Sequence, residues 1–386
     1  MRLAAGVLIF PAVLLACGAG SDGFELGATA CEPGPTLAFP GEAGPVVALN
    51  AYYLQEEATR ALRRGEATSA VVEEVLGEAA RLGVRAIRTN GFNDGADKVG
   101  DSAIQLAPLV YDEVAFRGLD LVLARARAHG LRLVLPLGNH WDAYGGARRY
   151  VGWAGLRGAR EGDPRFYTEP AVVDHYRAHV AALLDRVNTF DGIRYGDHPA
   201  VLAWELLNEP RGTGLRDGGV AMRRWVDDVA ATVKRHAPGH LVATGEEGFE
   251  AAGSSFERNT ASRWVDVASV HLYPEPWGVS AEDAAAFGAA WISAHAAVAR
   301  RLGKPLLVGE LGVRRDGSFG LEERRAILRG WLACARLSGA AGAAPWLYVN
   351  DARPRSWDPF SFGWLDGTAP EDPRNELVDV VLEAAR

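Results

Sequence analysis

The sequence predicts a (β/α)₈ barrel, and three observations support this fold class. Short apolar runs that read as buried parallel strands begin near Val46, Val84, Leu131, Val201, Leu241, Val267, Pro305 and Gly342. Segments with helical spacing of apolar residues separate most of these runs. The alternation continues from Pro45 to the C-terminus without a repeat or a change of composition. Such a pattern is typical of one α/β barrel domain, which we expect over residues 45–386.

The helices are expected from their apolar stripes and their end signals. One helix ends at Gly83 and carries the stripe Val72, Val75, Leu76 and Ala79. Another begins after Asp112, a predicted N-cap, and ends at Gly130. Further helices are expected over 172–187, 220–236, 281–301, 321–337 and 375–384, with the weakest signal between the fifth and sixth strands. A doubly wound open sheet is the alternative, but no glycine-rich phosphate loop supports it.

The N-terminal segment is predicted to be a targeting signal outside the barrel. Residues 1–16 combine a positive start with an apolar stretch too short to span a bilayer comfortably. The end of this stretch, Leu14-Leu15-Ala16-Cys17, resembles the lipobox of bacterial lipoproteins, which implies lipidation of Cys17. Cleavage as an ordinary signal peptide is the alternative. Residues 17–44 then form a tether and N-terminal segment, and the protein is exported, either anchored at a bacterial cell envelope or secreted.

Composition narrows the classes of partner. The formal net charge of −8, without a basic run, argues against nucleic-acid binding. The sequence lacks a clustered Cys/His ligand spacing, so we expect neither a metal nor another cofactor, and we expect a monomer. Besides Cys17, the chain contains Cys31 and Cys334, which either pair across the bottom of the barrel or remain free thiols.

Two glutamates follow buried strands and are the strongest functional signal. Glu209, in Asn208-Glu209-Pro210, follows the fourth strand, and Glu310 ends the seventh. Catalytic groups of a barrel lie at the C-terminal ends of its strands, so these carboxyls can approach one another across the mouth. A pair with one protonated and one ionised carboxyl breaks glycosidic bonds. Taken alone, each glutamate reads as a loop charge.

Other strand ends carry side chains that suit such a pair. Arg88 ends the second strand, where it can hold a nucleophile ionised or only bridge the mid-strand Glu205. The i, i+2 spacing of His271 and Tyr273 directs both to the same side of the sixth strand, although a core pair is the alternative. Trp346 ends the eighth strand, where an indole can support a sugar ring. Their joint occurrence favours a catalytic site.

Several stretches also carry a family resemblance. They include Gly138-Asn-His-Trp-Asp-Ala-Tyr-Gly-Gly, Trp204-Glu-Leu-Leu-Asn-Glu-Pro-Arg, Gly245-Glu-Glu-Gly-Phe and Val270-His-Leu-Tyr-Pro. With these motifs the chain resembles glycoside hydrolase family 5, and more narrowly its endo-β-1,4-mannanases, from about Asn50 to Trp346. The Asn-Glu-Pro motif is specific to the clan, and the other stretches narrow the resemblance to mannanase-like members.

The resemblance implies an activity and a role for each matching residue. The activity is retaining, endo-acting hydrolysis of β-1,4-mannosidic bonds in mannan, glucomannan or galactomannan, with a β-linked polysaccharide as the partner. Glu209 matches the general acid/base and Glu310 the nucleophile. The matching substrate-binding shell consists of Arg88, His140, Trp141, Asn208, Glu247, His271, Tyr273, Trp277 and Trp346.

Three departures from the family pattern leave the substrate open. Asn90 stands where such mannanases often have tryptophan, Leu311 follows the nucleophile where an aromatic residue is common, and residues 350–364 match no family stretch. A β-glucanase or an exo-β-mannosidase on the same barrel is therefore the alternative. The alternative from a different functional class is a surface lipoprotein that binds glycans without catalysis.

Overall fold

The structure is a computed structural model that describes residues 31–95, 100–250, 253, 255–315, 319–350, 358–364, 368–369, 372 and 375–386. The predicted signal peptide and Cys17 lie outside the described residues, so their processing stays a prediction. Within the described part of the chain, no helix combines the length and apolar character needed to cross a membrane.

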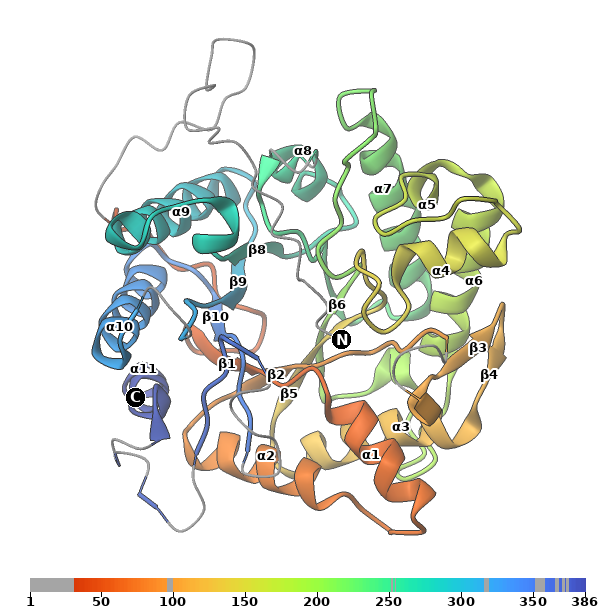
Figure 1. Cartoon of the computed structure of the whole chain (residues 1–386), viewed down its shortest axis with the longest axis horizontal. Helices are drawn as coiled ribbons and strands as arrows, with labels where there is room; N and C mark the ends of the chain where they lie inside the picture. The colour runs from red at the N-terminus through yellow and green to blue at the C-terminus, as the bar shows by residue number, and fades with distance from the viewer. Residues whose placement is uncertain are drawn as a thin grey trace, which may run out of the picture.

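Eight parallel strands form the predicted barrel, with the helices arranged around them (Figure 1). The strands are β1 Val46–Asn50, β2 Ala86–Arg88, β5 Arg132–Pro136, β6 Val201–Glu205, β7 Leu241–Ala243, β8 Ala268–Leu272, β9 Leu306–Leu311 and β10 Gly342–Pro345. Their order is β7-β6-β5-β2-β1-β10-β9-β8, and a parallel bridge between Ala243 and Val267 joins the two ends. Each strand begins within two residues of its predicted start.

The helices confirm the predicted alternation and add elements in the loops. They are α1 Leu54–Arg63, α2 Ala70–Arg81, α3 Glu113–Ala128, α4 Gly146–Trp153, α5 Arg165–Thr168, α6 Pro170–Asp185, α7 Val220–His236, α8 Phe256–Thr260, α9 Ala281–Arg301, α10 Leu321–Leu337 and α11 Val378–Ala385. Short 3₁₀ helices cover Gly100–Ser102, Tyr195–Asp197 and Glu275–Trp277, and a hairpin pairs β3 Gln105–Ala107 with β4 Val110–Tyr111. The last helix begins at Val378, three residues later than expected.

Local chemistry accounts for two predicted helix boundaries. Asp112 caps α3 because its carboxylate accepts the backbone N–H of Ala115 at 2.9 Å. Gly83, which follows α2, has φ +77°, a left-handed conformation that favours glycine. The weak helical signal between the fifth and sixth strands corresponds to α8, which has five residues.

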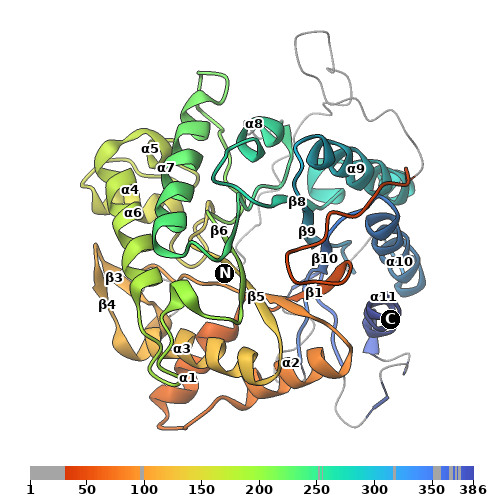
Figure 2. The same cartoon turned by 180° about the vertical axis from the view of Figure 1, so that it is seen from behind.

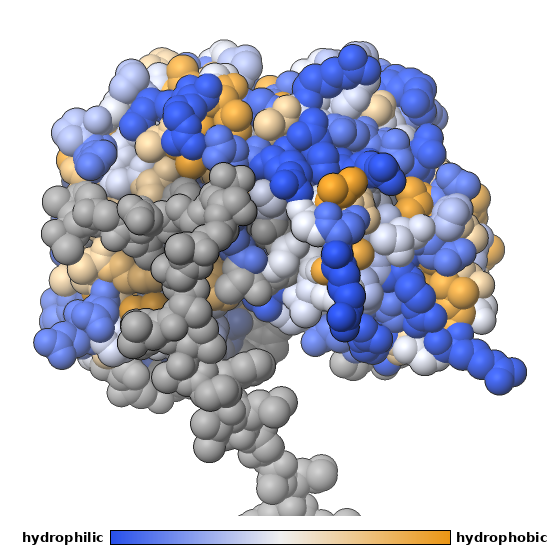
Figure 3. Space-filling view, turned by 90° about the horizontal axis from the view of Figure 1, so that it is seen from above, coloured by the Kyte–Doolittle hydropathy of each residue, from blue (hydrophilic) through white to orange (hydrophobic). Residues whose placement is uncertain are grey.

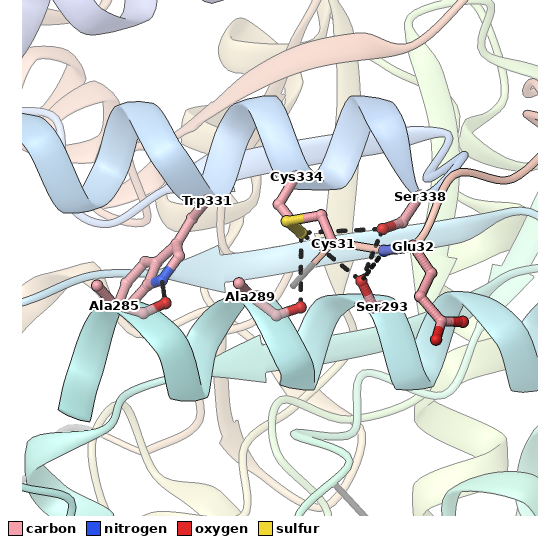
Figure 4. Close-up of a disulfide and its surroundings, with 8 residues drawn as sticks. All are labelled: Cys31, Glu32, Ala285, Ala289, Ser293, Trp331, Cys334 and Ser338. Carbon is pink, nitrogen blue, oxygen red and sulfur yellow. Dashed lines mark hydrogen bonds between the residues drawn. A yellow bond between two sulfur atoms is a disulfide. The ribbon is translucent and has the colours of Figure 1, made fainter. Parts of the chain in front are cut away.

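The N-terminal segment closes the barrel from below. Phe39, 2% exposed, packs in the interior cluster with small and branched side chains of the strands, including Val46, Val134 and Leu307. Nearer the N-terminus, Cys31 is joined to Cys334 of α10 by a disulfide, with the two Cα atoms 5.4 Å apart (Figure 4). Figure 2 shows the segment running from the side of α9 and α10 towards β1.

Candidate active site

Glu209 and Glu310 lie together at the C-terminal ends of the strands, as predicted. One carboxylate oxygen of each lies, together with a ring nitrogen of His271, in a group of atoms within 4.8 Å of one another. Glu209 has φ +50°, an unfavourable conformation for a residue with a side chain. Its backbone N–H donates to the carbonyl of Gly245 at 2.9 Å, which fixes this turn after β6. Glu310 lies within β9, in register with His271 of β8.

Arg88 binds both of its predicted carboxylate partners, Glu205 and Glu310. Its guanidinium donates to Glu205 from Nε at 3.0 Å and from Nη2 at 2.8 Å. Nη1 donates to Glu310 at 2.6 Å, and Nη2 also donates to the side-chain oxygen of Asn208 at 2.7 Å. Arg88 and Glu205 are both buried. Arg88 therefore fixes the Glu310 carboxylate and the motif before Glu209 with one buried positive charge.

His271 and Tyr273 complete the contacts of Glu310. The Tyr273 hydroxyl donates to Glu310 Oε2 at 2.5 Å, and His271 Nδ1 lies 3.6 Å from Glu310 Oε1. The same His271 nitrogen lies 2.7 Å from Glu209 Oε1. Burial lowers the pKa of His271, so a neutral imidazole stands between the two carboxyl groups. The predicted i, i+2 placement of both side chains is confirmed.

Glu209 has a different set of neighbours. The indole N–H of Trp141 donates to Glu209 Oε2 at 2.6 Å, and His271 contacts Oε1. Burial raises the pKa of both Glu209 and Glu310. On Glu310, the Arg88 guanidinium and the Tyr273 hydroxyl oppose this rise, whereas on Glu209 the strongest opposition comes from Trp141. The two carboxyls thus share a buried site but differ in the groups that stabilise their anions.

Asn208 and His140 support the turn that carries Glu209. The Asn208 amide donates to the side chain of Asn139 at 3.0 Å, and its oxygen accepts from Arg88. His140 is buried, with Nδ1 3.1 Å from the Tyr167 hydroxyl. Burial lowers the pKa of His140 to about 4. The structure therefore places His140 beneath the loop after β6, where it packs as a neutral side chain.

Arg211 is a residue that the sequence did not single out. Its guanidinium forms two hydrogen bonds with Glu247, at 2.6 and 2.7 Å, and lies over the Trp141 ring with 4.5 Å to the centroid. Glu247 and Trp141, both predicted, are thus connected to one another and to Glu209. A lone arginine after Asn-Glu-Pro has no distinctive sequence signal. Only the fold brings it to Glu247, 36 residues further along the chain.

The predicted aromatic residues occupy two different settings. Trp346 follows β10 and stacks on Tyr52, with 5.2 Å between ring centroids. Trp277 packs against Phe249 at 4.9 Å and Trp291 at 4.8 Å, in an aromatic cluster outside β8. The Trp291 indole donates to the carbonyl of His271 at 3.1 Å. Trp277 therefore supports the site through this cluster.

In Figure 3, the described part of one face is largely hydrophilic, with apolar residues scattered among the polar ones.

Comparisons with known proteins agree with this geometry. The family model described as GH family 5 beta-mannosidase-like matches residues 47–355. Mannan endo-1,4-beta-mannosidase 3 of Oryza sativa subsp. japonica is 40% identical over 76% of this chain and 63% of its own. Mannan endo-1,4-beta-mannosidase 1 of the same plant is 37% identical over 72% and 67%. The chain thus spans about two thirds of the length of these relatives.

A solved structure shows the same architecture. The endo-beta-1,4-mannanase from Thermotoga petrophila superposes with a TM-score of 0.77 at 27% identity, covering 90% of this chain and 77% of that one. The family match covers well over half of the residues and contains both glutamates and all of the barrel strands except Val46, the first residue of β1. The chain belongs to the β-mannosidase-like group of glycoside hydrolase family 5.

Proposed function

We propose that this protein is a retaining endo-β-1,4-mannanase. The observation that carries the proposal is the approach of the Glu209 and Glu310 carboxylate oxygens to within 4.8 Å across the barrel mouth. Retaining glycosidases hold their two carboxyls roughly 5–5.5 Å apart, whereas inverting enzymes need about 6.5–9.5 Å to admit a water molecule. The mannanase names of the relatives support mannan as the substrate.

The neighbours of each carboxyl support the assignment of roles. Glu310 is the nucleophile, because Arg88 and the Tyr273 hydroxyl stabilise its anion directly. Glu209 is the general acid/base, because its contacts are with the indole of Trp141 and the neutral His271. Glu310 attacks the anomeric carbon while Glu209 protonates the leaving oxygen. Glu209 then deprotonates the water that releases the sugar.

Azide rescue tests the two roles. We expect Glu310→Ala to abolish turnover of an aryl β-mannoside, and added azide to restore it with an α-mannosyl azide as the product. Glu209→Ala with azide should instead give the β-mannosyl azide, because the glycosyl-enzyme still forms. Anomeric NMR of the products distinguishes the two. An α-azide from Glu209→Ala, with no rescue of Glu310→Ala, would show that the roles are exchanged.

Product profiles test the substrate and the mode of cleavage. We expect mannan and glucomannan to yield a series of short oligosaccharides, and cellulose to yield no products. Release of mannose alone from chain ends would indicate an exo-β-mannosidase, and cleavage of cellulose a β-glucanase. Tight glycan binding without reducing-end release at any pH would favour a non-catalytic binding protein.

We also propose that the protein is exported and lipidated on Cys17, and that it acts as a monomer. The disulfide between Cys31 and Cys334 supports export, because such bonds persist in oxidising compartments. Mass spectrometry of the mature N-terminus tests the lipid. A mature chain that begins at Cys17 without added acyl mass would exclude the anchor. Sedimentation analysis of the protein without its first 16 residues tests the monomer.

A further inference from the structure

Residues 358–364 follow β10 and lie against the candidate site. A guanidinium nitrogen of Arg324 in α10 donates to the carbonyl of Phe360 at 3.2 Å. On the other side of this segment, the backbone N–H of Phe362 donates to the carbonyl of Leu347 at 2.9 Å. The family match ends at residue 355, so the segment lies beyond it. These two hydrogen bonds hold the segment in place, and with it the side chain of Phe360.

The ring of Phe360 packs on Tyr273, whose hydroxyl contacts Glu310. The two ring centroids are 5.1 Å apart and the ring planes meet at 68°, an edge-to-face arrangement that is favourable for aromatic side chains. Gly312, just after β9, permits this close approach. A Cβ at that position would lie only 3.1 Å from Phe360 Cδ1 and 3.5 Å from Tyr273 Cε1. Phe360 therefore restricts the positions that the Tyr273 ring can take.

The position of Tyr273 affects the ionisation of Glu310. Its hydroxyl donates to Glu310 Oε2 at 2.5 Å. Burial raises the pKa of Glu310, and this hydrogen bond opposes the rise because it stabilises the anion. The charged and titratable groups that face these two side chains are Arg88, Glu209, His271 and Asp358. Phe360 carries no charge, so replacing its side chain leaves all of these groups in place.

We propose that Phe360 is a positioning residue that orients the Tyr273 hydroxyl toward Glu310. The inference rests on the proposed function, in which an ionised Glu310 attacks the anomeric carbon. Without the Phe360 ring, the Tyr273 ring gains freedom and its hydrogen bond to Glu310 is weaker on average. A smaller fraction of molecules then carries an ionised Glu310 at acid pH. The effect passes through the Tyr273 hydroxyl and is absent when that hydroxyl is removed.

Titration of the Glu310 carboxyl by ¹³C NMR tests the inference without turnover. In protein labelled at the glutamate side-chain carboxyls, the Glu310 signal is the one that Glu310→Gln lacks. We expect Phe360→Ala to move its midpoint to higher pH by about half a pH unit or more, which is roughly a threefold change in the ionisation equilibrium. Phe360→Tyr keeps the ring and should restore the parent midpoint. In the Tyr273→Phe protein, Phe360→Ala should cause no further change.

Steady-state kinetics on an aryl β-mannoside give a second measure. The acid limb of kcat/KM should move to higher pH in Phe360→Ala, because the nucleophile must be ionised. The matched control is Phe190→Ala, since Phe190 is 38% exposed and its ring lies beside Arg117. This variant should keep the parent midpoint and the parent acid limb.

Circular dichroism first establishes that each variant is folded. A folded Phe360→Ala protein with the parent Glu310 midpoint would overturn the inference, as would an equal shift in the Tyr273→Phe background. A parent protein without turnover would contradict the proposed hydrolase activity instead. The two failures are distinguishable because the NMR titration does not depend on activity.

Discussion

At the scale of single residues, Arg88 connects most of the candidate site. Its buried guanidinium contacts Glu205, Glu310, Asn208 and the side-chain oxygen of Asn50, the last at 3.3 Å. Glu205 is fully buried and receives two of these hydrogen bonds. Burying a carboxylate without a partner costs free energy. Glu205 and Glu310 therefore both depend on Arg88. One residue therefore links the stability of the barrel to the chemistry at its mouth.

Replacing Arg88 should reduce stability and activity together. We expect Arg88→Met to lower the free energy of unfolding by about 3 kcal/mol or more, because it leaves buried carboxylates unpaired. We expect kcat to fall by roughly a hundredfold or more, through loss of the charge beside Glu310. Arg88→Lys keeps the charge but cannot reproduce the planar set of donors, so intermediate values are expected.

Urea unfolding and steady-state kinetics measure both effects. The matched control is Arg301→Met, because Arg301 ends α9 and its ion pair with Glu257 is on the surface, with the two side chains 58% and 54% exposed. That pair should contribute less than about 1 kcal/mol. An Arg88→Met protein as stable as the Arg301→Met protein would show that the buried cation does not support the barrel.

The sequence predicts the site residues that lie at the ends of strands. It does not predict the residues whose role depends on their tertiary contacts. Glu209, Glu310, Arg88, His271 and Tyr273 follow apolar runs, so their positions in the barrel followed from the fold class. Arg211 could not be found in this way, because its partners come from other strand–helix loops. The setting of Trp277 was also beyond the sequence, since stacking on Phe249 and Trp291 depends on tertiary packing.

At the scale of elements, the N-terminal segment is attached to the barrel at two points. Phe39 fills the lower end of the interior core, and the disulfide fixes Cys31 to α10. Around the disulfide, Ser293 of α9 hydrogen-bonds to Ser338 at 2.9 Å and accepts the backbone N–H of Glu32 at 3.1 Å (Figure 4). The segment thus joins α9 and α10 to the region before β1. The two cysteines of the disulfide are 303 residues apart in the sequence.

Removing the disulfide should destabilise the protein without affecting the catalytic site. We expect Cys334→Ser to lower the free energy of unfolding by about 2–5 kcal/mol, since the bond closes a very long loop. Activity below the unfolding transition should remain at the parent level. Dithiothreitol should destabilise the parent protein by a similar amount and leave Cys334→Ser unchanged. A reductant effect of equal size in both proteins would contradict this.

The elements differ in how well the sequence predicts them. Buried parallel strands read as continuous apolar runs, which is why all eight starts were found. The β3–β4 hairpin, α1, α4 and α5 were missed because they lie in the loops that follow β1, β2 and β5, where tertiary contacts outweigh the local pattern. Gln105 illustrates this, since its amide donates to Tyr150 at 3.0 Å and to Asp94 at 3.3 Å. Contacts between three separate segments leave no periodic signal.

At the scale of the whole molecule, burial moves the pKa values of acids and histidines in opposite directions. Burial raises the pKa of Asp94 and of Glu246 to about 7 each. It lowers the pKa of His140, His240 and His295 to about 4 each. At these buried positions the folded state therefore favours the neutral form of both kinds of side chain. In the folded state, these acids bind their protons more tightly than they do in the unfolded chain. These histidines bind their protons less tightly.

Stability should consequently be highest at weakly acidic pH. The unfolded carboxyls lose their protons near pH 4, whereas Asp94 and Glu246 keep theirs in the folded state to about pH 7. Their contribution is therefore full at low pH and is lost as the pH rises through 7. The histidines act in the opposite sense, because the unfolded chain gains protons below about pH 6.5 while the buried rings stay neutral to about pH 4.

Urea midpoints between pH 4 and 9 measure this curve, and two substitutions test its alkaline side. Asp94→Asn and Glu246→Gln keep the shape of each side chain but remove its titration. We expect the double variant to lose less stability than the parent between pH 5 and 8, while the fall below pH 6 persists because the histidines remain. The control is Asp174→Asn, since Asp174 is an exposed residue of α6. If the double variant lost stability as steeply as the parent up to pH 8, other groups would have to account for the alkaline instability.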